Sequence, residues 1–291
     1  MPLEALKGGT RMWSYRTYGK QNDQNKIKIT DAQYLFYRGA RTNCLNEILN
    51  MCEKITIAEA MFKNFTDENV ATIDFSKLDT SETKTMLEMF YGCSNLVSLD
   101  LSNFNTSNVQ TMESMFEFCS GLETLNINNF NTQKVKSTSG MFARCGKLKT
   151  VDVTSFDTSN VTNVSEMFYE CSAITDLDLS SFDLSKVTNN NKLLERCYEL
   201  TNLTSFRNLG KGYTSKTTDY SNYSLKLSDC TKLTHDSLVS VMNNLYDLNL
   251  TYNVANGGTL YRQSLVLGST NLAKLTAEEI AVATNKGWNV T

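Results

Sequence analysis

Residues 89–104 read MFYGCSNLVSLDLSNF, and residues 115–130 repeat the pattern as MFEFCSGLETLNINNF. In both copies a Met-Phe pair precedes a cysteine, a group of spaced aliphatic residues and a phenylalanine. Equivalent positions are 26 residues apart. Because a fixed period of this length is typical of proteins built from stacked structural repeats, the sequence predicts a solenoid.

The period extends well beyond these two copies. Five cysteines follow it: Cys93, Cys119, Cys145, Cys171 and Cys197. Toward the N-terminus, Phe36 and Phe62 are also 26 residues apart, whereas Phe62 and Phe90 are 28 apart, so one coil carries about two additional residues near Asp67. Counting from Phe36 to Leu194, we expect about seven coils.

Each coil is expected to contain one strand and one short helix. Leu99 and Leu101 alternate with polar residues, as in a strand with one buried face. Val109, Met112 and Phe116 recur at intervals of three and four residues, as on one face of a helix. The predicted fold class is therefore an α/β solenoid, a leucine-rich-repeat-like stack of strand-helix coils with N- and C-terminal caps.

The repeats are expected to occupy residues 34–210. They lie between an N-terminal cap or attachment segment, residues 1–33, and a C-terminal α/β cap domain, residues 211–291. Such covers are needed because the ends of a stack expose apolar side chains and unpaired strand edges.

Two helices can be placed within the predicted C-terminal domain. Thr234 is the expected N-cap of the first, whose apolar residues share one face. Thr276 and Glu279 have the spacing of a capping box at the start of the second, and Gly287 is expected to end it.

Composition narrows the range of functions. The 291 residues carry 28 Lys and Arg against 31 Asp and Glu, a net charge of −3. This mildly acidic chain shows no basic stripe, which argues against nucleic-acid binding. No apolar run approaches the roughly 18 residues of a membrane span, so no membrane insertion is expected. The N-terminal stretch lacks the apolar core of a secretion signal, which argues against ordinary export.

The cysteine column has two interpretations. Neighbours stacked about 4.8 Å apart are close enough for disulfide bonds, and cysteine also binds metals. However, a column in phase with Leu and Phe is typical of buried free thiols that act as small apolar side chains. We expect the second, and no CxxC pair suggests a zinc site.

The polar positions of the predicted strands form the candidate binding surface, which we call the strand face. Its residues are Asp100, Asn126, Asp152, Asp178, Asp176 and Asn128. Such groups can form hydrogen bonds with glycan hydroxyls or attract a basic protein surface. Calcium is a weaker alternative, because Asn126 interrupts the carboxylates and the ion takes six or more ligands. The simplest alternative is a solvated strand face without a ligand.

No catalytic site, cofactor or metal site is expected. His235 is the single histidine and stands beside the expected start of a helix. A pairing with Cys230 as nucleophile would need spatial contact and a third, orienting group, and the sequence indicates neither. We therefore expect a binding protein and not an enzyme.

The repeat string, seen in residues 89–101 and 153–162, resembles the BspA-like leucine-rich-repeat surface proteins of low-GC Gram-positive bacteria and their phages. The segments 267–276 and 283–288 resemble C-termini found in phage tail and prophage structural proteins. The resemblance implies surface display and binding of host or partner molecules.

These observations together favour a phage virion or tail component that recognises a host-surface glycan or protein. Residues 1–33 would dock onto other virion proteins, and incorporation into the particle would place the chain outside the cell without a secretion signal. The alternatives are a purely structural or decoration virion protein and a bacterial cell-surface adhesin fragment. A homo-oligomer is left open, since no coiled-coil heptads occur.

Overall fold

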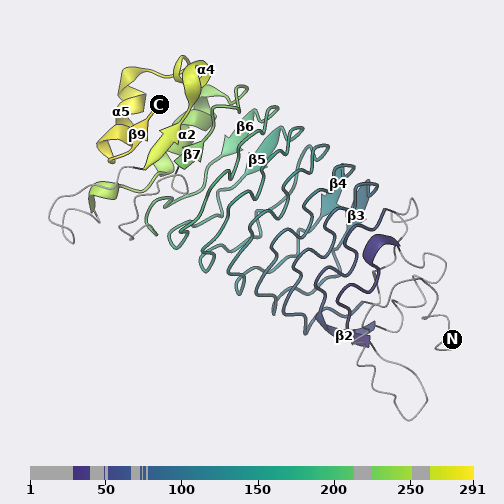
Figure 1. The fold of residues 1–291 in the computed structure, drawn as a ribbon. Coiled ribbons are helices and arrows are strands. Elements are labelled where there is room, and N and C mark those ends of the chain that lie inside the picture. Colours follow the sequence, from purple (N-terminus) through teal and green to yellow (C-terminus); the bar gives the residue numbers. More distant parts are fainter. Residues whose placement is uncertain are drawn as a thin grey trace, which may run out of the picture.

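The computed structural model describes residues 29–39, 49, 52–66, 73, 75–76, 78–212, 224–250 and 263–291. The chain winds into an elongated stack of coils, with a helical C-terminal region at one end (Figure 1). Most of the expected N-terminal segment and the expected insertion near Asp67 lie outside the described residues.

Short parallel strands stack at the 26-residue period. β3 (Ser98–Asp100) pairs with β4 (Thr124–Asn126), and β5 (Asp176–Asp178) pairs with β6 (Asn202–Thr204). In each pair every residue lies opposite its counterpart one repeat later, and a bridge from Thr150 to Asp176 continues the series. The strands therefore lie along one edge of the stack, as Figure 1 shows.

A second ladder of parallel bridges runs along another side of the coils. It joins Ile57, Thr85, Thr111, Ser137, Asn163 and Asn189 in turn. At the N-terminal end of the described stack, β1 (Ile29–Asp31) pairs with β2 (Cys52–Ile57). The 3-10 helix η2 (Tyr37–Gly39) lies between these two strands in the sequence. Several neighbouring coils are thus bonded to each other at two places.

The helix expected in each coil does not form anywhere in residues 78–212. The Met-Phe segments are successive turns, and their N–H groups donate to the next coil: Phe90 N lies 2.9 Å from Met115 O. Ser114 and Phe118 adopt left-handed backbone, with φ of 51° and 61°, which a right-handed helix excludes. The prediction of strand-helix coils is therefore wrong, and the coils consist of strands and turns.

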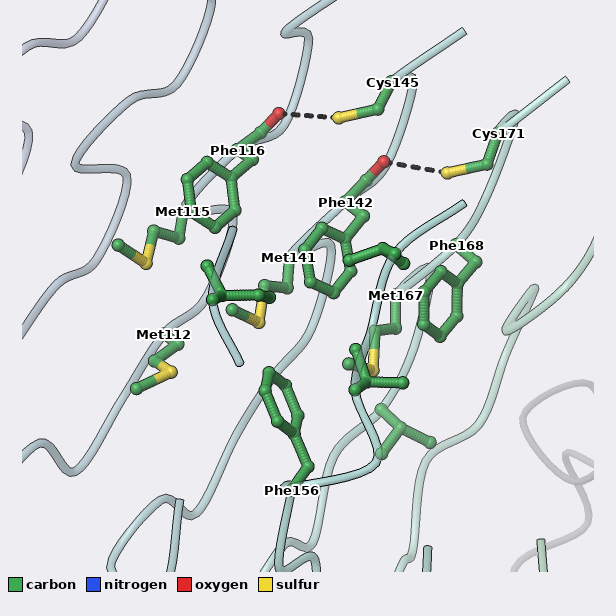
Figure 2. Close-up of a cluster of buried hydrophobic side chains, with 14 of the residues drawn as sticks. Met112, Met115, Phe116, Met141, Phe142, Cys145, Phe156, Met167, Phe168 and Cys171 are labelled. Atoms are coloured by element: carbon green, nitrogen blue, oxygen red, sulfur yellow. Dashed lines mark hydrogen bonds between the residues drawn. The ribbon is translucent and has the colours of Figure 1, made fainter. Parts of the chain in front are cut away.

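The core is built from columns of equivalent side chains that run along the stack (Figure 2). The rings of Phe90, Phe116, Phe142 and Phe168 are stacked, with successive centroids 5.7, 5.8 and 5.3 Å apart. All four rings are buried. Since full burial of such a side chain stabilises a fold by about 1.5–3 kcal/mol, the column is a major source of stability.

The cysteine column consists of buried free thiols, which confirms the second interpretation of its spacing. Each thiol donates to a backbone carbonyl one coil back, as Cys145 Sγ does to Phe116 O at 3.1 Å (Figure 2). Burial raises the pKa of Cys171 to about 12. Cys230 lies outside the 26-residue period, yet its thiol donates to Leu194 O at 3.3 Å and extends the series.

A buried threonine in each of four successive coils forms a second kind of link between coils. Thr132 Oγ1 accepts from the N–H of Asp157 at 2.7 Å and donates to its carbonyl at 2.9 Å. Three further threonines make the same pair of bonds: Thr80, Thr106 and Thr158. The polar stretch between strands is therefore part of the interior and not only a solvated turn.

Among its described residues, the C-terminal region contains a parallel sheet and several helices. The sheet has the order β7 (Ser224–Lys226), β8 (Ser264–Val266) and β9 (Asn289–Val290). The helices include α2 (His235–Asn244), α4 (Gly268–Leu272) and α5 (Ala277–Asn285), and residues 248–250 are also helical. Within the described residues, no helix has the length and apolar character that crossing a bilayer requires.

Both predicted helix starts are confirmed. Thr234 caps α2 by accepting from Ser237 N at 3.3 Å, and Thr276 with Glu279 forms the capping box of α5. The start of α2 also contacts the last repeat strand, because Ser237 Oγ accepts from Leu203 N at 2.9 Å. Helix α2 thus packs on the end of the stack.

Candidate binding surface

The six residues of the strand face follow one another across the coils. Asp100, Asp152, Asp176, Asp178 and Asn128 are exposed, and Asn126 is partly buried. Because β3 pairs in register with β4 and Thr150 is bridged to Asp176, neighbouring positions within these pairs are separated by about 4.8 Å. The stacking therefore brings these residues together on one surface, as the period predicts.

The aspartates of this surface also shape the chain locally. Asp100 Oδ1 accepts from Ser102 N at 2.9 Å, and Asp178 Oδ1 accepts from Ser180 N at 2.9 Å. These bonds form the turns that end the strands. A carboxylate can accept about four hydrogen bonds, so the turns leave capacity for a ligand.

Neighbouring donors keep the strand face ionised. The hydroxyl and N–H of Thr154, at 2.6 and 3.0 Å from Asp152 Oδ1, lower the pKa of that carboxyl group. The Thr175 hydroxyl and the Asn202 amide lower the pKa of Asp176 in the same way. Since residues 98–102, 124–128, 150–154 and 176–180 contain no lysine or arginine, the surface is negatively charged at neutral pH.

The orientation of the Asn126 amide argues against a calcium ion at the strand face. Its Nδ2 donates to Asp100 Oδ1 at 2.9 Å, so it presents a hydrogen and not an oxygen toward that carboxylate. The described residues include no group of three or more His, Cys, Asp or Glu arranged to hold a metal ion. This arrangement is suited to hydrogen bonding rather than to cation coordination.

A different, charge-balanced surface lies along the Met-Phe turns. Arg144 lies between Glu117 and Glu170, at 2.8 and 3.2 Å, and its guanidinium packs over the rings of Phe118 and Tyr169. These pairs were not predicted, although opposite charges about one repeat apart in the sequence indicate them. Because Arg144 and both glutamates are paired, these contacts hold coils together, and this part of the surface attracts a charged ligand less than the strand face does.

The two residues considered for catalysis have separate surroundings. Cys230 is buried, with its thiol bonded to Leu194 O. His235 is exposed, and its Nε2 lies 2.8 Å from Glu279 Oε1 in α5. Each residue therefore has a structural partner of its own.

Comparisons with known proteins place the solenoid in a family. A family model described as "Mycoplasma protein of unknown function, DUF285" matches residues 30–149, 56–176 and 120–223 in overlapping windows. No curated protein matches the sequence.

Two solved structures are similar to the chain. One is the T. pallidum leucine-rich repeat protein TpLRR, with 15% identity and a TM-score of 0.42 over 74% of this chain and 82% of that one. The other is a leucine-rich cell surface protein from Faecalibacterium prausnitzii A2-165, with 18% identity and a TM-score of 0.32 over 68% of this chain and 55% of that one.

Proposed function

This chain belongs to the DUF285 family, described as Mycoplasma protein of unknown function, and from that premise we propose that it is a surface-displayed recognition protein without catalytic activity. It binds a host-surface glycan or protein through the strand face. The resemblance of the repeat string to BspA-like surface proteins supports display, and the geometry of the strand face supports binding.

The observation that carries this proposal is the row of exposed carboxylates along the strand side of the stack. Asp100, Asp152 and Asp178 occupy equivalent positions in different coils, and their hydrogen-bonded turns fix their orientation. A glycan chain or a basic protein segment that lies along the stack contacts several of them at once. Such repeated contacts add affinity without a deep pocket.

Adsorption of the full chain to host cell-wall material and to host surface proteins tests the proposal. The variant Asp152→Asn with Asp178→Asn removes two charges but keeps the oxygens that accept the turn hydrogen bonds. We expect saturable adsorption of the wild type and at least a tenfold weaker affinity of this variant. Glu59→Gln with Glu113→Gln, the same change of charge at another position of the coils, is the matched control.

Equal adsorption by wild type and the strand-face variant would exclude the strand face as the binding surface. Absence of any saturable adsorption would favour a structural or decoration role instead.

We further propose that the chain is displayed on a phage particle. The resemblance of the C-terminal segments to phage tail proteins supports a virion component, docked through its N-terminal segment to other virion proteins. Antibody labelling of intact particles and intact cells distinguishes the two locations: label on purified virions supports the phage component, whereas label on cells alone supports a bacterial adhesin.

A further inference from the structure

A shallow groove runs along the coils beside the second ladder of bridges. It consists of two hollows of about 290 and 590 Å³ that share Gln110 and Lys134. We name it the lysine groove after the residues that matter for its chemistry: Lys84, Asn108, Gln110, Lys134, Lys136 and Asn160. The shared residues make the two hollows one continuous surface over several coils.

The positive charge of the lysine groove is not neutralised by neighbouring carboxylates. Lys134 Nζ donates to the amide oxygen of Asn108 at 2.6 Å, and no ion pair among the described residues involves Lys84, Lys134 or Lys136. The groove has one carboxylate in its lining, Glu82, which pairs with Lys54 at 3.3 Å. The groove therefore attracts anions.

The lysines are regularly spaced because they occupy repeated positions. Lys84 and Lys136 are equivalent residues two coils apart, and Gln110 lies between them. The same holds for Lys134 and Lys186, which are separated by Asn160, and Lys186 Nζ donates to Asn160 Oδ1 at 2.8 Å. Two coils correspond to about 10 Å along the stack. Lysines thus alternate with amides along each row, and Lys186 continues the second row beyond the residues that line the groove.

We propose that the lysine groove is a second binding site, for a linear acidic polysaccharide. Its ammonium groups bind the regularly spaced acidic groups of the polymer, and its amides bind hydroxyl groups between them. Single-stranded nucleic acid fits less well, because such sites stack bases on aromatic side chains and the two hollows are lined by none.

No basic stripe is visible in the sequence because these lysines are spread over residues 84–186. Only the stacking of the coils gathers them, on a surface distinct from the acidic strand face. Opposite charge on the two surfaces means that they select different ligands, so binding at one can be measured separately from binding at the other.

Fluorescence anisotropy of labelled polymers with the full chain tests the proposal. The probes are polygalacturonate, heparin and poly(glycerol phosphate), which distinguish carboxylate, sulfate and phosphate, with neutral dextran and oligo(dT) for comparison. We expect at least one acidic glycan to bind more tightly than dextran and oligo(dT), with an affinity that falls as salt is added.

Lys134→Gln with Lys136→Gln should weaken that binding at least tenfold. Lys147→Gln with Lys149→Gln is the matched control, because it makes the same change of charge at exposed positions of the same coil. The strand-face variant Asp152→Asn with Asp178→Asn should bind the acidic glycan as the wild type does. The proposal for the lysine groove and the proposal for the strand face are therefore tested independently of each other.

Three results would overturn the proposal. They are binding of every acidic glycan no tighter than dextran, an equal loss of affinity in the groove variant and its control, and tighter binding of oligo(dT) than of any glycan. The last result would replace the polysaccharide by a nucleic acid.

Discussion

Thr132 shows how a polar residue can belong to the interior of this fold. Its exposed fraction is 1%, and its hydroxyl satisfies both backbone groups of Asp157 in the next coil. Nothing in the expected strand-helix coil assigned this threonine to the interior. The repetition of threonine at one position of the period, the same signal that located the cysteines, could have found it.

Replacing Thr132 by valine should lower the free energy of unfolding by about 2 kcal/mol, because the buried N–H and carbonyl of Asp157 lose their partner. Urea unfolding followed by circular dichroism measures the change. Thr124→Val, on the exposed surface of β4, should change the stability by less than about 0.5 kcal/mol. If both substitutions had the same effect, the threonine link would not contribute as described.

At the scale of elements, the strands were predictable and the turns were not. Alternation of apolar and polar residues identified β3, β4, β5 and β6 and their exposed positions. The intervals of three and four residues from Val109 to Phe116 indicated a helix, yet left-handed residues four apart produce turns with the same spacing. Periodicity alone does not distinguish these two backbones, because both bring residues three or four apart to one side.

The strand positions that face the core differ in burial. Substitution by a charged residue should therefore lower the free energy of unfolding by different amounts at different positions. Ile127 has an exposed fraction of 1%, whereas Leu125 is partly buried. Ile127→Asp should therefore destabilise the solenoid by about 4 kcal/mol or more, and Leu125→Asp by clearly less. Thermal unfolding of both variants measures the difference, and a larger effect at Leu125 would contradict the packing.

The contact between α2 and α5 should depend on pH. Hydrogen bonds donated by its ring nitrogens to the carboxylates of Asp236 and Glu279 raise the pKa of His235 above its ordinary value. A raised pKa means that the folded state holds the proton more tightly, so the stabilisation is present below about pH 6.5 and is lost as the pH rises through the folded pKa.

Hydrogen exchange of α5, corrected for the intrinsic effect of pH, should therefore be slower at about pH 6 than at about pH 8. His235→Gln should abolish the difference. Unchanged pH dependence in that variant would show that another group is responsible.

For the whole molecule, stacking converts one repeated sequence into surfaces of different charge. The strand face is acidic, the lysine groove is basic, and the surface around Arg144 is balanced by its carboxylates. The acidic row was predictable because its residues occupy equivalent positions in consecutive coils. The groove was not, since it joins residues from two positions of the period whose proximity depends on the path of the turns.

Carboxyl-group footprinting with a carbodiimide and an amine tests the role of the strand face most directly. The full chain is labelled with and without saturating host cell-wall material or surface protein, and each modified carboxylate is located by mass spectrometry. We predict that Asp100, Asp152, Asp176 and Asp178 are protected by the bound partner, while Glu59 and Glu113 react as before. Saturating binding that leaves those four aspartates as reactive as in the free chain would contradict the assignment.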